Sequence, residues 1–184
     1  AEVIDTTGLS DKTYVMANGY AAIDVSNYSA IQNGSGFNNR NEFVSNNMVV
    51  VPDNGKYMSS VRTSSSTITY MDASELETAP YVEYKVYVPY DGTYNIQSQF
   101  NPTSNVEYGN QQLRYGISVD GGDITITNSI GNDYLAGAYS GTWTRDIEKN
   151  GRASVVSNIS LSAGTHTIRY YQCDPNMALI RMTV

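Results

Sequence analysis

The residue types that carry out nucleophilic catalysis are scarce in this chain of 184 residues. A serine or cysteine hydrolase needs a base beside its nucleophile, and the only histidine is His166. It lies in the segment GTHTIR and shares a strand face with Ile168 and Tyr170, which favours a half-buried histidine hydrogen-bonded to a neighbour. Cys173 has Arg169 as its sole basic neighbour within five positions, so an activated thiolate has little support. Nucleophilic catalysis is therefore not indicated.

Three carboxylates stand close together in the segment YMDASELET: Asp72, Glu75 and Glu77. Glycosidase carboxylates face each other across a substrate at about 5 to 10 Å and usually come from different strands, so closeness in sequence is weak evidence. A solvated acidic loop is the favoured interpretation. The sequence also lacks an EF-hand loop, a metal-binding histidine pair, a phosphate-binding glycine loop and a dinucleotide motif. We therefore predict that the chain is not an enzyme.

Two other residues have the chemistry of a sugar site. A sugar offers apolar C–H faces and a ring of hydroxyls, so its site needs a flat aromatic ring and an amide or carboxylate. Trp143 and Asn176 supply these groups. Alternatively, Trp143 anchors a loop or fills the core, and Asn176 makes local turn bonds. Because Pro175 cannot donate to a β-ladder, we expect Asp174, Pro175 and Asn176 to form an exposed corner.

Short strand-like runs must position these groups. They occur at residues 19–26, 48–51, 81–88, 93–100, 113–119, 123–127 and 155–161, with turn sequences such as Asp-Gly between them. Residues 164–184 hold two further runs, which we predict to form a closing β-hairpin around the corner. This pattern predicts an all-β sandwich or barrel. We expect a single domain at residues 19–184 after an irregular lead-in at residues 1–18.

Two long loops are predicted, at residues 30–47 and at residues 129–151. The first is rich in Asn, Gly and Ser. The second carries Tyr134, Tyr139 and Trp143, and these three large aromatics make it the better candidate for function. No window shows the apolar spacing of a helix longer than a turn or two.

Composition excludes some classes of partner. The formal charge of −7, without a cluster of Lys and Arg, argues against nucleic acid and against an anionic membrane surface. The single cysteine excludes an intrachain disulfide. Tyr contributes 16 residues against 3 Phe and 1 Trp, and its ring with a polar tip suits half-buried strands as well as platforms that face a sugar or a protein.

The order of motifs resembles a known family. The segments GYAAIDVSNYS, MVVVPDNGKYMSSV, APYVEYKVYVPYDGTYNIQSQFNPTSN, LRYGISVDGG and SAGTHTIRYYQCDPNMALIRM together resemble the C-terminal β-sandwich domain of glycoside hydrolase family 115 α-glucuronidases. The resemblance implies a non-catalytic accessory domain linked covalently to catalytic or scaffold modules of a secreted protein. The catalytic barrel of those enzymes is absent from this sequence, so glucuronidase activity is not carried over.

That domain is similar in turn to carbohydrate-binding modules of families 6 and 35, which implies a β-sandwich (jelly-roll) of mainly antiparallel strands. In these modules aromatic residues clamp a sugar ring and an asparagine at the last strand binds its hydroxyls. By this resemblance Trp143 and Asn176 are carbohydrate-binding, with Tyr57, Tyr70 and Tyr139 as further platform candidates.

The modules commonly hold a structural calcium ion between first-strand and last-strand acidic residues. The corresponding positions here are Asp24 and Ser26 in the first strand and Ala178 in the last. Calcium takes about six to eight oxygen ligands, so Ala178 weakens the usual site, although Asp24 with loop carbonyls could hold an ion.

The leading hypothesis is a carbohydrate-binding module that recognises plant cell-wall polysaccharide, such as xylan, a β-glucan or another hemicellulose. The alternative is a structural or dimerisation module of a glycoside hydrolase without a ligand of its own. A stand-alone hydrolase is the third hypothesis, and it lacks a base other than His166.

Overall fold

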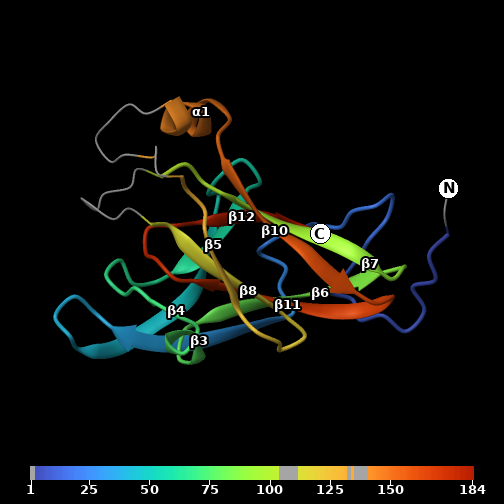
Figure 1. Cartoon of the computed structure of the whole chain (residues 1–184), viewed down its shortest axis with the longest axis horizontal. Coiled ribbons are helices and arrows are strands. Elements are labelled where there is room, and N and C mark those ends of the chain that lie inside the picture. The colour runs from blue at the N-terminus through green and yellow to red at the C-terminus, as the bar shows by residue number, and fades with distance from the viewer. Residues whose placement is uncertain (1–2, 104–111, 132–133, 135–140) are drawn as a thin grey trace.

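Buried and exposed side chains alternate along the long strands, as a period of two requires when one face of a sheet is covered. In β6 (Tyr81–Val88) the alternation runs through every residue. The computed structural model describes residues 3–103, 112–131, 134 and 141–184 (Figure 1). The other strands are β1 (Thr13–Val15), β2 (Ala22–Ile23), β3 (Ala30–Phe37), β4 (Phe43–Pro52), β5 (Ser59–Thr63), β7 (Gly92–Phe100), β8 (Arg114–Val119), β9 (Thr125–Asn128), β10 (Arg152–Leu161), β11 (Gly164–Gln172) and β12 (Leu179–Thr183). The described helices are the 3₁₀ turn η1 (Glu75–Glu77) and α1 (Gly141–Glu148).

The strands form two layers that share one hydrogen-bonded path. One layer has the order β10-β7-β12-β5-β4 and the other has β3-β6-β11-β8-β9, and the pairing of β3 with β4 joins them. Figure 1 shows β7, β10 and β12 across the upper layer and β3, β6 and β11 across the lower. Among the described pairs, only β1 with β6 is parallel. The predicted all-β sandwich of mainly antiparallel strands is confirmed.

The main core lies between the two layers. Each layer contributes apolar side chains that are almost fully buried: Val82, Tyr84, Val86, Val88, Ile168 and Tyr170 from the lower layer, and Val61, Ile96, Phe100, Leu179 and Met182 from the upper. Tyr84 and Tyr115 enter this core with a hydrogen-bonded hydroxyl, whereas the Tyr170 hydroxyl has no partner among the described residues. The Tyr84 hydroxyl donates to the Val25 carbonyl at 2.8 Å, and that of Tyr115 is 2.9 Å from the Ser154 hydroxyl. Several tyrosines are therefore core residues.

The C-terminal runs do not form the predicted hairpin. The first run, β11, pairs with β6 and β8, whereas β12 pairs with β2, β5 and β7 in the opposite layer. The corner between them therefore crosses from one layer to the other. Alternation identifies the buried face of a strand but not its partner, and for this reason the prediction of a hairpin was wrong.

The segment 30–47, predicted as a loop, contains β3 and the first half of β4. Its Asn, Gly and Ser residues are poor strand formers, but backbone pairing of β3 with both β4 and β6 holds it extended. The lead-in at residues 1–18 is likewise not irregular throughout, since β1 pairs with β6 and Met16 is buried. The second predicted loop holds α1, which is about two turns long. Over the described part of the chain, no helix has the length and apolar character needed to cross a membrane.

Candidate functional site

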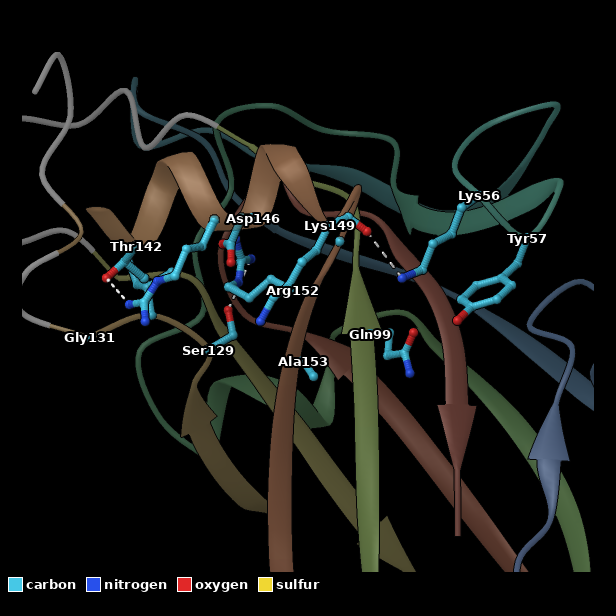
Figure 2. A pocket seen from close by; sticks show the side chains of 13 residues that line it. Lys56, Tyr57, Gln99, Ser129, Gly131, Thr142, Asp146, Lys149, Arg152 and Ala153 are labelled. Carbon is cyan, nitrogen blue, oxygen red and sulfur yellow. Dashed lines mark hydrogen bonds and ion pairs between the residues drawn. The ribbon is translucent and has the colours of Figure 1, made fainter. Parts of the chain in front are cut away.

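A pocket of about 420 Å³ opens beneath α1, at the start of β10 (Figure 2). Its lining comes from the turn between β4 and β5, from β7, from the segment after β9, from α1 and from the first residues of β10. These segments are far apart in sequence. We call this site the α1 pocket.

The turn between β4 and β5 brings an aromatic ring to the pocket. Asp53 and Gly55 both have positive φ, at 52° and 89°, and a side chain at Gly55 would collide with Asn101. The tight turn places Tyr57, which is half-buried, on the pocket wall. The guanidinium carbon of Arg181 lies 4.1 Å from the centre of the Tyr57 ring and Lys56 Nζ lies 5.2 Å from it, so two cations contact the ring.

Helix α1 forms the rim. Trp143 is half-buried and packs against the main core, which anchors the helix. Arg145 donates to the Gly141 carbonyl at 3.2 Å and to the Thr142 hydroxyl at 3.1 Å, so its guanidinium stays along the helix. Lys149, in the turn directly after α1, is exposed and also lines the pocket.

The floor of the pocket holds a buried arginine. Arg152 is only 6% exposed, and its Nη2 donates to the Ser129 hydroxyl at 3.2 Å. Its Nη1 lies 3.6 Å from the Asp146 carboxylate, too far for a hydrogen bond. Arg152 Nε and Nη1 and Asp146 Oδ2 make no hydrogen bond within the described part of the chain. Burial lowers the pKa of Arg152 and raises that of Asp146.

The α1 pocket is positive in a negative chain. Four cationic side chains and one carboxylate line it, a formal excess of three positive charges, although the whole chain carries −7. The cations are Lys56, Arg145, Lys149 and Arg152. Figure 2 shows Lys56, Lys149 and Arg152 around the pocket. Such an arrangement attracts anions.

A second hollow, of about 670 Å³, lies over β3 and β4, and we call it the amide groove. Gln32 and Asn33 line it from β3, Asn47 from β4 and Tyr81 from β6. Gly34 is required here, because a Cβ at this position would overlap the backbone of residues 78–80. Apart from Glu77, the lining carries no charged side chain.

The structure separates the aromatic residues predicted to bind sugar. Tyr57 lines the α1 pocket, and Trp143 lies on α1 without being part of the lining. Tyr70 is 2% exposed, donates to the Ser35 carbonyl at 2.9 Å and accepts from Asn46 at 3.2 Å, so the prediction that it forms a platform was wrong. Tyr139 lies outside the described residues.

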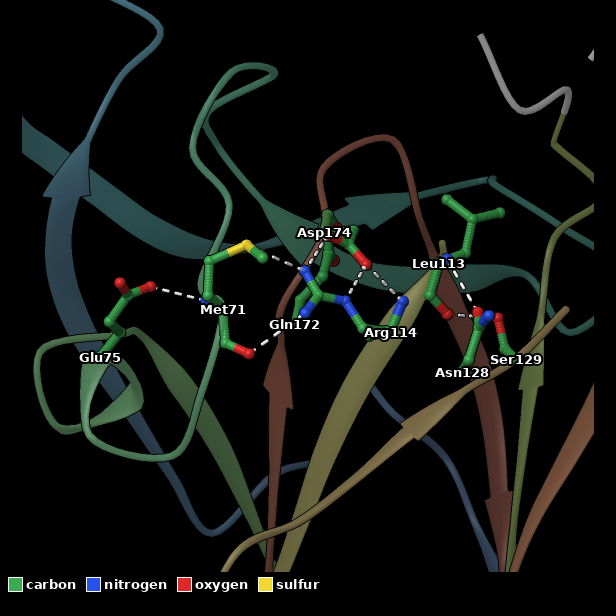
Figure 3. A network of polar contacts seen from close by, with 8 residues as sticks. All are labelled: Met71, Glu75, Leu113, Arg114, Asn128, Ser129, Gln172 and Asp174. Carbon is green, nitrogen blue, oxygen red and sulfur yellow. Dashed lines mark hydrogen bonds and ion pairs between the residues drawn. The ribbon is translucent and has the colours of Figure 1, made fainter. Parts of the chain in front are cut away.

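The corner at residues 174–176 is largely buried, contrary to expectation. The Asp174 carboxylate accepts from Arg114 Nε at 2.9 Å and Nη2 at 2.8 Å, and from the Arg114 backbone at 2.7 Å (Figure 3). Pro175 is buried, whereas Asn176 is exposed with φ of 63°. Asn176 lies outside the linings of both hollows. A sugar contact by Asn176 stays a prediction.

Asp24, the candidate calcium ligand, is exposed, and its Oδ1 accepts from the backbone and hydroxyl of Ser26 at 2.9 and 2.7 Å. Among the residues that the structure describes, no three His, Cys, Asp or Glu residues gather in a way that could hold a metal ion. Ala178 offers no side-chain oxygen. These residues do not fit the two-sided carboxylate site of the modules, and calcium binding through Asp24 stays a prediction.

The catalytic candidates have structural partners. His166 is buried, with Nδ1 2.6 Å from the Asp120 carboxylate and Nε2 2.8 Å from the Ser162 carbonyl, as predicted for a strand histidine. Burial raises the pKa of Cys173 to about 12, which keeps it a thiol. Asp72 accepts from the Ser74 and Glu75 backbones at the start of η1.

Sequence reasoning missed the cations of the α1 pocket. Three of them, Arg145, Lys149 and Arg152, lie within eight residues of chain, and Lys56 is far from them in sequence. The spacing of Arg145 and Lys149 is that of neighbours on a helix face, but the segment lacks the apolar spacing of a longer helix and is predicted as a loop.

Several solved structures share the fold of this chain. The chain resembles BtGH115A, described as a family GH115 4-O-methyl-α-glucuronidase with specificity for decorated arabinogalactans, with a TM-score of 0.55 and 12% identity, over 85% of this chain and 17% of that one. It also resembles a family 35 carbohydrate-binding module from Clostridium thermocellum, with a TM-score of 0.50 and 22% identity, over 88% and 95%. A third similar structure is a Podospora anserina GH26-CBM35 β-(1,4)-mannanase, with a TM-score of 0.50 and 9% identity, over 91% of this chain and 27% of that one.

At these identities the likeness establishes the fold, and the chain spans about a sixth of the length of BtGH115A. No curated protein matches the sequence. Residues 13–184 match the Glycosyl hydrolase family 115 C-terminal domain, and the chain therefore belongs to this family.

Proposed function

We propose that the chain is a non-catalytic carbohydrate-binding module of a larger secreted glycoside hydrolase, that it recognises plant cell-wall polysaccharide, and that it does so through the α1 pocket. The observation that carries this proposal is the pairing of the half-buried Tyr57 ring with polar groups in one pocket. A sugar needs both an apolar surface for its C–H face and partners for its hydroxyls.

The polar groups suit sugar hydroxyls. Gln99 on β7 offers an amide that both donates and accepts, and the hydroxyls of Ser129 and Thr142 lie on the opposite wall. Figure 2 shows the Tyr57 hydroxyl directed toward the side of the pocket that holds Gln99. Xylan, a β-glucan or another hemicellulose would place its hydroxyls between these walls.

The similar proteins support the same role. The family 35 module from Clostridium thermocellum is described as carbohydrate-binding, and the family of this chain is the C-terminal domain of a glycosyl hydrolase. Since His166, Cys173 and Asp72 hold structural partners, we assign catalysis to another part of the parent protein.

Affinity electrophoresis on gels that contain xylan, β-glucan or mannan tests this proposal. We expect retardation on at least one gel, and Tyr57→Ala should abolish it. Tyr20→Ala is the matched control, because Tyr20 is 56% exposed and lies outside the pocket. Normal mobility of the unmodified chain on every gel would overturn the proposal.

One observation favours a second candidate, a structural or dimerisation module. Phe37 and Phe43 are 58% and 57% exposed at the tip of the β3–β4 hairpin, with ring centres 5.0 Å apart. Val44 beside them is 38% exposed. Sedimentation at micromolar concentration tests this alternative: Phe43→Ser should remove self-association if the tip is an interface, and a monomeric parent chain would count against dimerisation.

A further inference from the structure

We propose that the amide groove is a second carbohydrate-binding site, which takes a neutral, unbranched glycan chain along the β3–β4 hairpin. The lining of the groove shares no residue with that of the α1 pocket. The inference therefore goes beyond the proposed function and does not depend on it.

The register of the hairpin places three pairs of side chains on one face. The two members of a pair lie directly opposite each other, and successive pairs are two residues apart, which keeps them on the same side of the ribbon. The pairs are Asn33 with Asn47, Ser35 with Ser45 and Phe37 with Phe43. At the usual rise of a strand this row is about 13 Å long, which exceeds one sugar ring and suits a chain.

The amides of this row are not used within the fold. Asn33 is exposed and Asn47 is half-buried, and neither side chain makes a hydrogen bond within the described part of the chain. Asn46, on the other face of the ribbon, is buried instead, donates to the Tyr70 hydroxyl at 3.2 Å and accepts from the Ser65 backbone at 3.0 Å. A side-chain amide both donates and accepts, as sugar hydroxyls do, so the free amides can exchange water for a glycan.

The charge of the groove favours a neutral chain. Glu77 is the one charged residue among the described residues that line it, whereas four cationic side chains line the α1 pocket. An anionic glycan would meet this carboxylate without a cation in the lining, in a protein of net charge −7. A single exposed carboxylate is also a weak partner for a cationic ligand.

Aromatic rings stand at both ends of the row. Phe37 and Phe43 are 58% and 57% exposed at the tip of the hairpin, with ring centres 5.0 Å apart. Tyr81 lines the opposite end, beside Gln32, its cross-strand partner on β3. Exposed rings are stabilised when they are covered, and the C–H faces of sugars can cover them while the hydroxyls reach the amides between.

NMR titration of the whole chain with cellohexaose, xylohexaose and mannohexaose tests this inference. We expect the side-chain amide signals of Asn33 and Asn47 to move with at least one hexaose, while that of the hydrogen-bonded Asn46 stays in place. The corresponding monosaccharide fills only part of the row and should bind at least about tenfold more weakly. Because the groove is open to solvent, we expect it to bind more weakly than the α1 pocket, so that gel retardation still depends on Tyr57.

Variants locate the binding without changing the core. The double change Asn33→Ala and Asn47→Ala should weaken hexaose binding at least about tenfold, followed on the Ser35 backbone signal, with an unchanged unfolding midpoint. Phe43→Ser should also weaken it. Asn27→Ala is the matched control, since Asn27 is exposed and lies outside both linings.

The outcomes separate this inference from the proposed function. Groove signals that still move in the Tyr57→Ala chain would support a separate site, and their loss in that chain would overturn it. If no hexaose moves the groove signals, the inference fails, while gel retardation that needs Tyr57 would leave the proposed function intact. A galacturonate hexamer that binds the groove as tightly as the neutral hexaoses would overturn the preference for a neutral chain. If Phe43→Ser removes self-association and leaves hexaose affinity unchanged, the ring pair is an interface and not part of the site.

Discussion

Arg114 and Arg152 are both largely buried arginines beside a carboxylate, but their hydrogen bonding differs. Arg114 makes two side-chain bonds to Asp174, at 2.8 and 2.9 Å, and a third to the Met71 carbonyl at 3.2 Å (Figure 3). Arg152 stands 3.6 Å from Asp146 and bonds only the Ser129 hydroxyl within the described residues. Hydrogen bonding to Asp174 raises the pKa of Arg114, whereas burial lowers that of Arg152.

The difference indicates two roles. An arginine whose bonds are satisfied within the fold holds segments together, and here Arg114 ties β8 to the corner between β11 and β12. Arg152 leaves Nε and Nη1 without an acceptor among the described residues, so it contributes less to holding the fold together. The following predictions test this division.

The largest expected effect on stability is at the Arg114–Asp174 pair. Arg114→Gln should lower the free energy of unfolding by about 3–5 kcal/mol, because it leaves the Asp174 carboxylate buried without its bidentate partner. Urea unfolding measures this loss. A loss below about 1 kcal/mol would mean that the corner does not depend on Arg114.

A smaller effect is expected at the same corner. Asn176→Ala should lower stability by about 1 kcal/mol, since φ of 63° disfavours a residue with a Cβ and no local bonding group. Asn176→Gly, which accepts this φ, is the matched control. Asn176 lies outside the α1 pocket lining, so polysaccharide retardation that persists in both variants would locate binding at the pocket, and its loss in both would support the predicted sugar contact of Asn176.

The His166–Asp120 pair is hydrogen-bonded but partly exposed to solvent, since the Asp120 side chain is 49% exposed. Burial lowers the pKa of His166, but bonds to the Ser162 carbonyl and Asp120 outweigh it and raise the pKa overall. Stability from this pair is therefore complete below the ordinary histidine pKa of about 6.5 and is lost as pH rises through the folded value. Urea unfolding across this range should show a decrease of about 1 kcal/mol or less.

Asp120→Asn is the control for this pH effect. It removes the charged partner and should flatten the pH dependence. An unfolding free energy that rises with pH in the parent chain over the same range would contradict the pairing.

The smallest effect on stability is expected at the Arg152–Asp146 pair, whose members are not hydrogen-bonded to each other. The double variant Arg152→Met with Asp146→Asn removes both charges together, and its unfolding free energy should stay within about 1 kcal/mol of the parent value. A loss as large as that of Arg114→Gln would show that Arg152 is a structural residue like Arg114.

Much of the fold could be predicted because it depends on local pattern. Alternation in β6 identified its buried face, and the motifs around Gly164 identified the family. The structural role of His166 followed from its place on the buried face of β11. The pattern failed where backbone pairing overrode composition, as in β3, and where a strand changed layers, as after β11.

The sequence by itself therefore determined the all-β class, the buried faces and the scarcity of catalytic groups, because each follows from residue type and a period of two. Only the tertiary structure decided that Asp174 anchors a buried corner while Tyr57, Arg145, Lys149 and Arg152 share a pocket. The positions of the pocket residues span nearly a hundred residues of chain, and their proximity depends on how the strands pair and how α1 packs. No local pattern carries that information, because side chains that are far apart in sequence form a pocket only when long-range contacts bring them together.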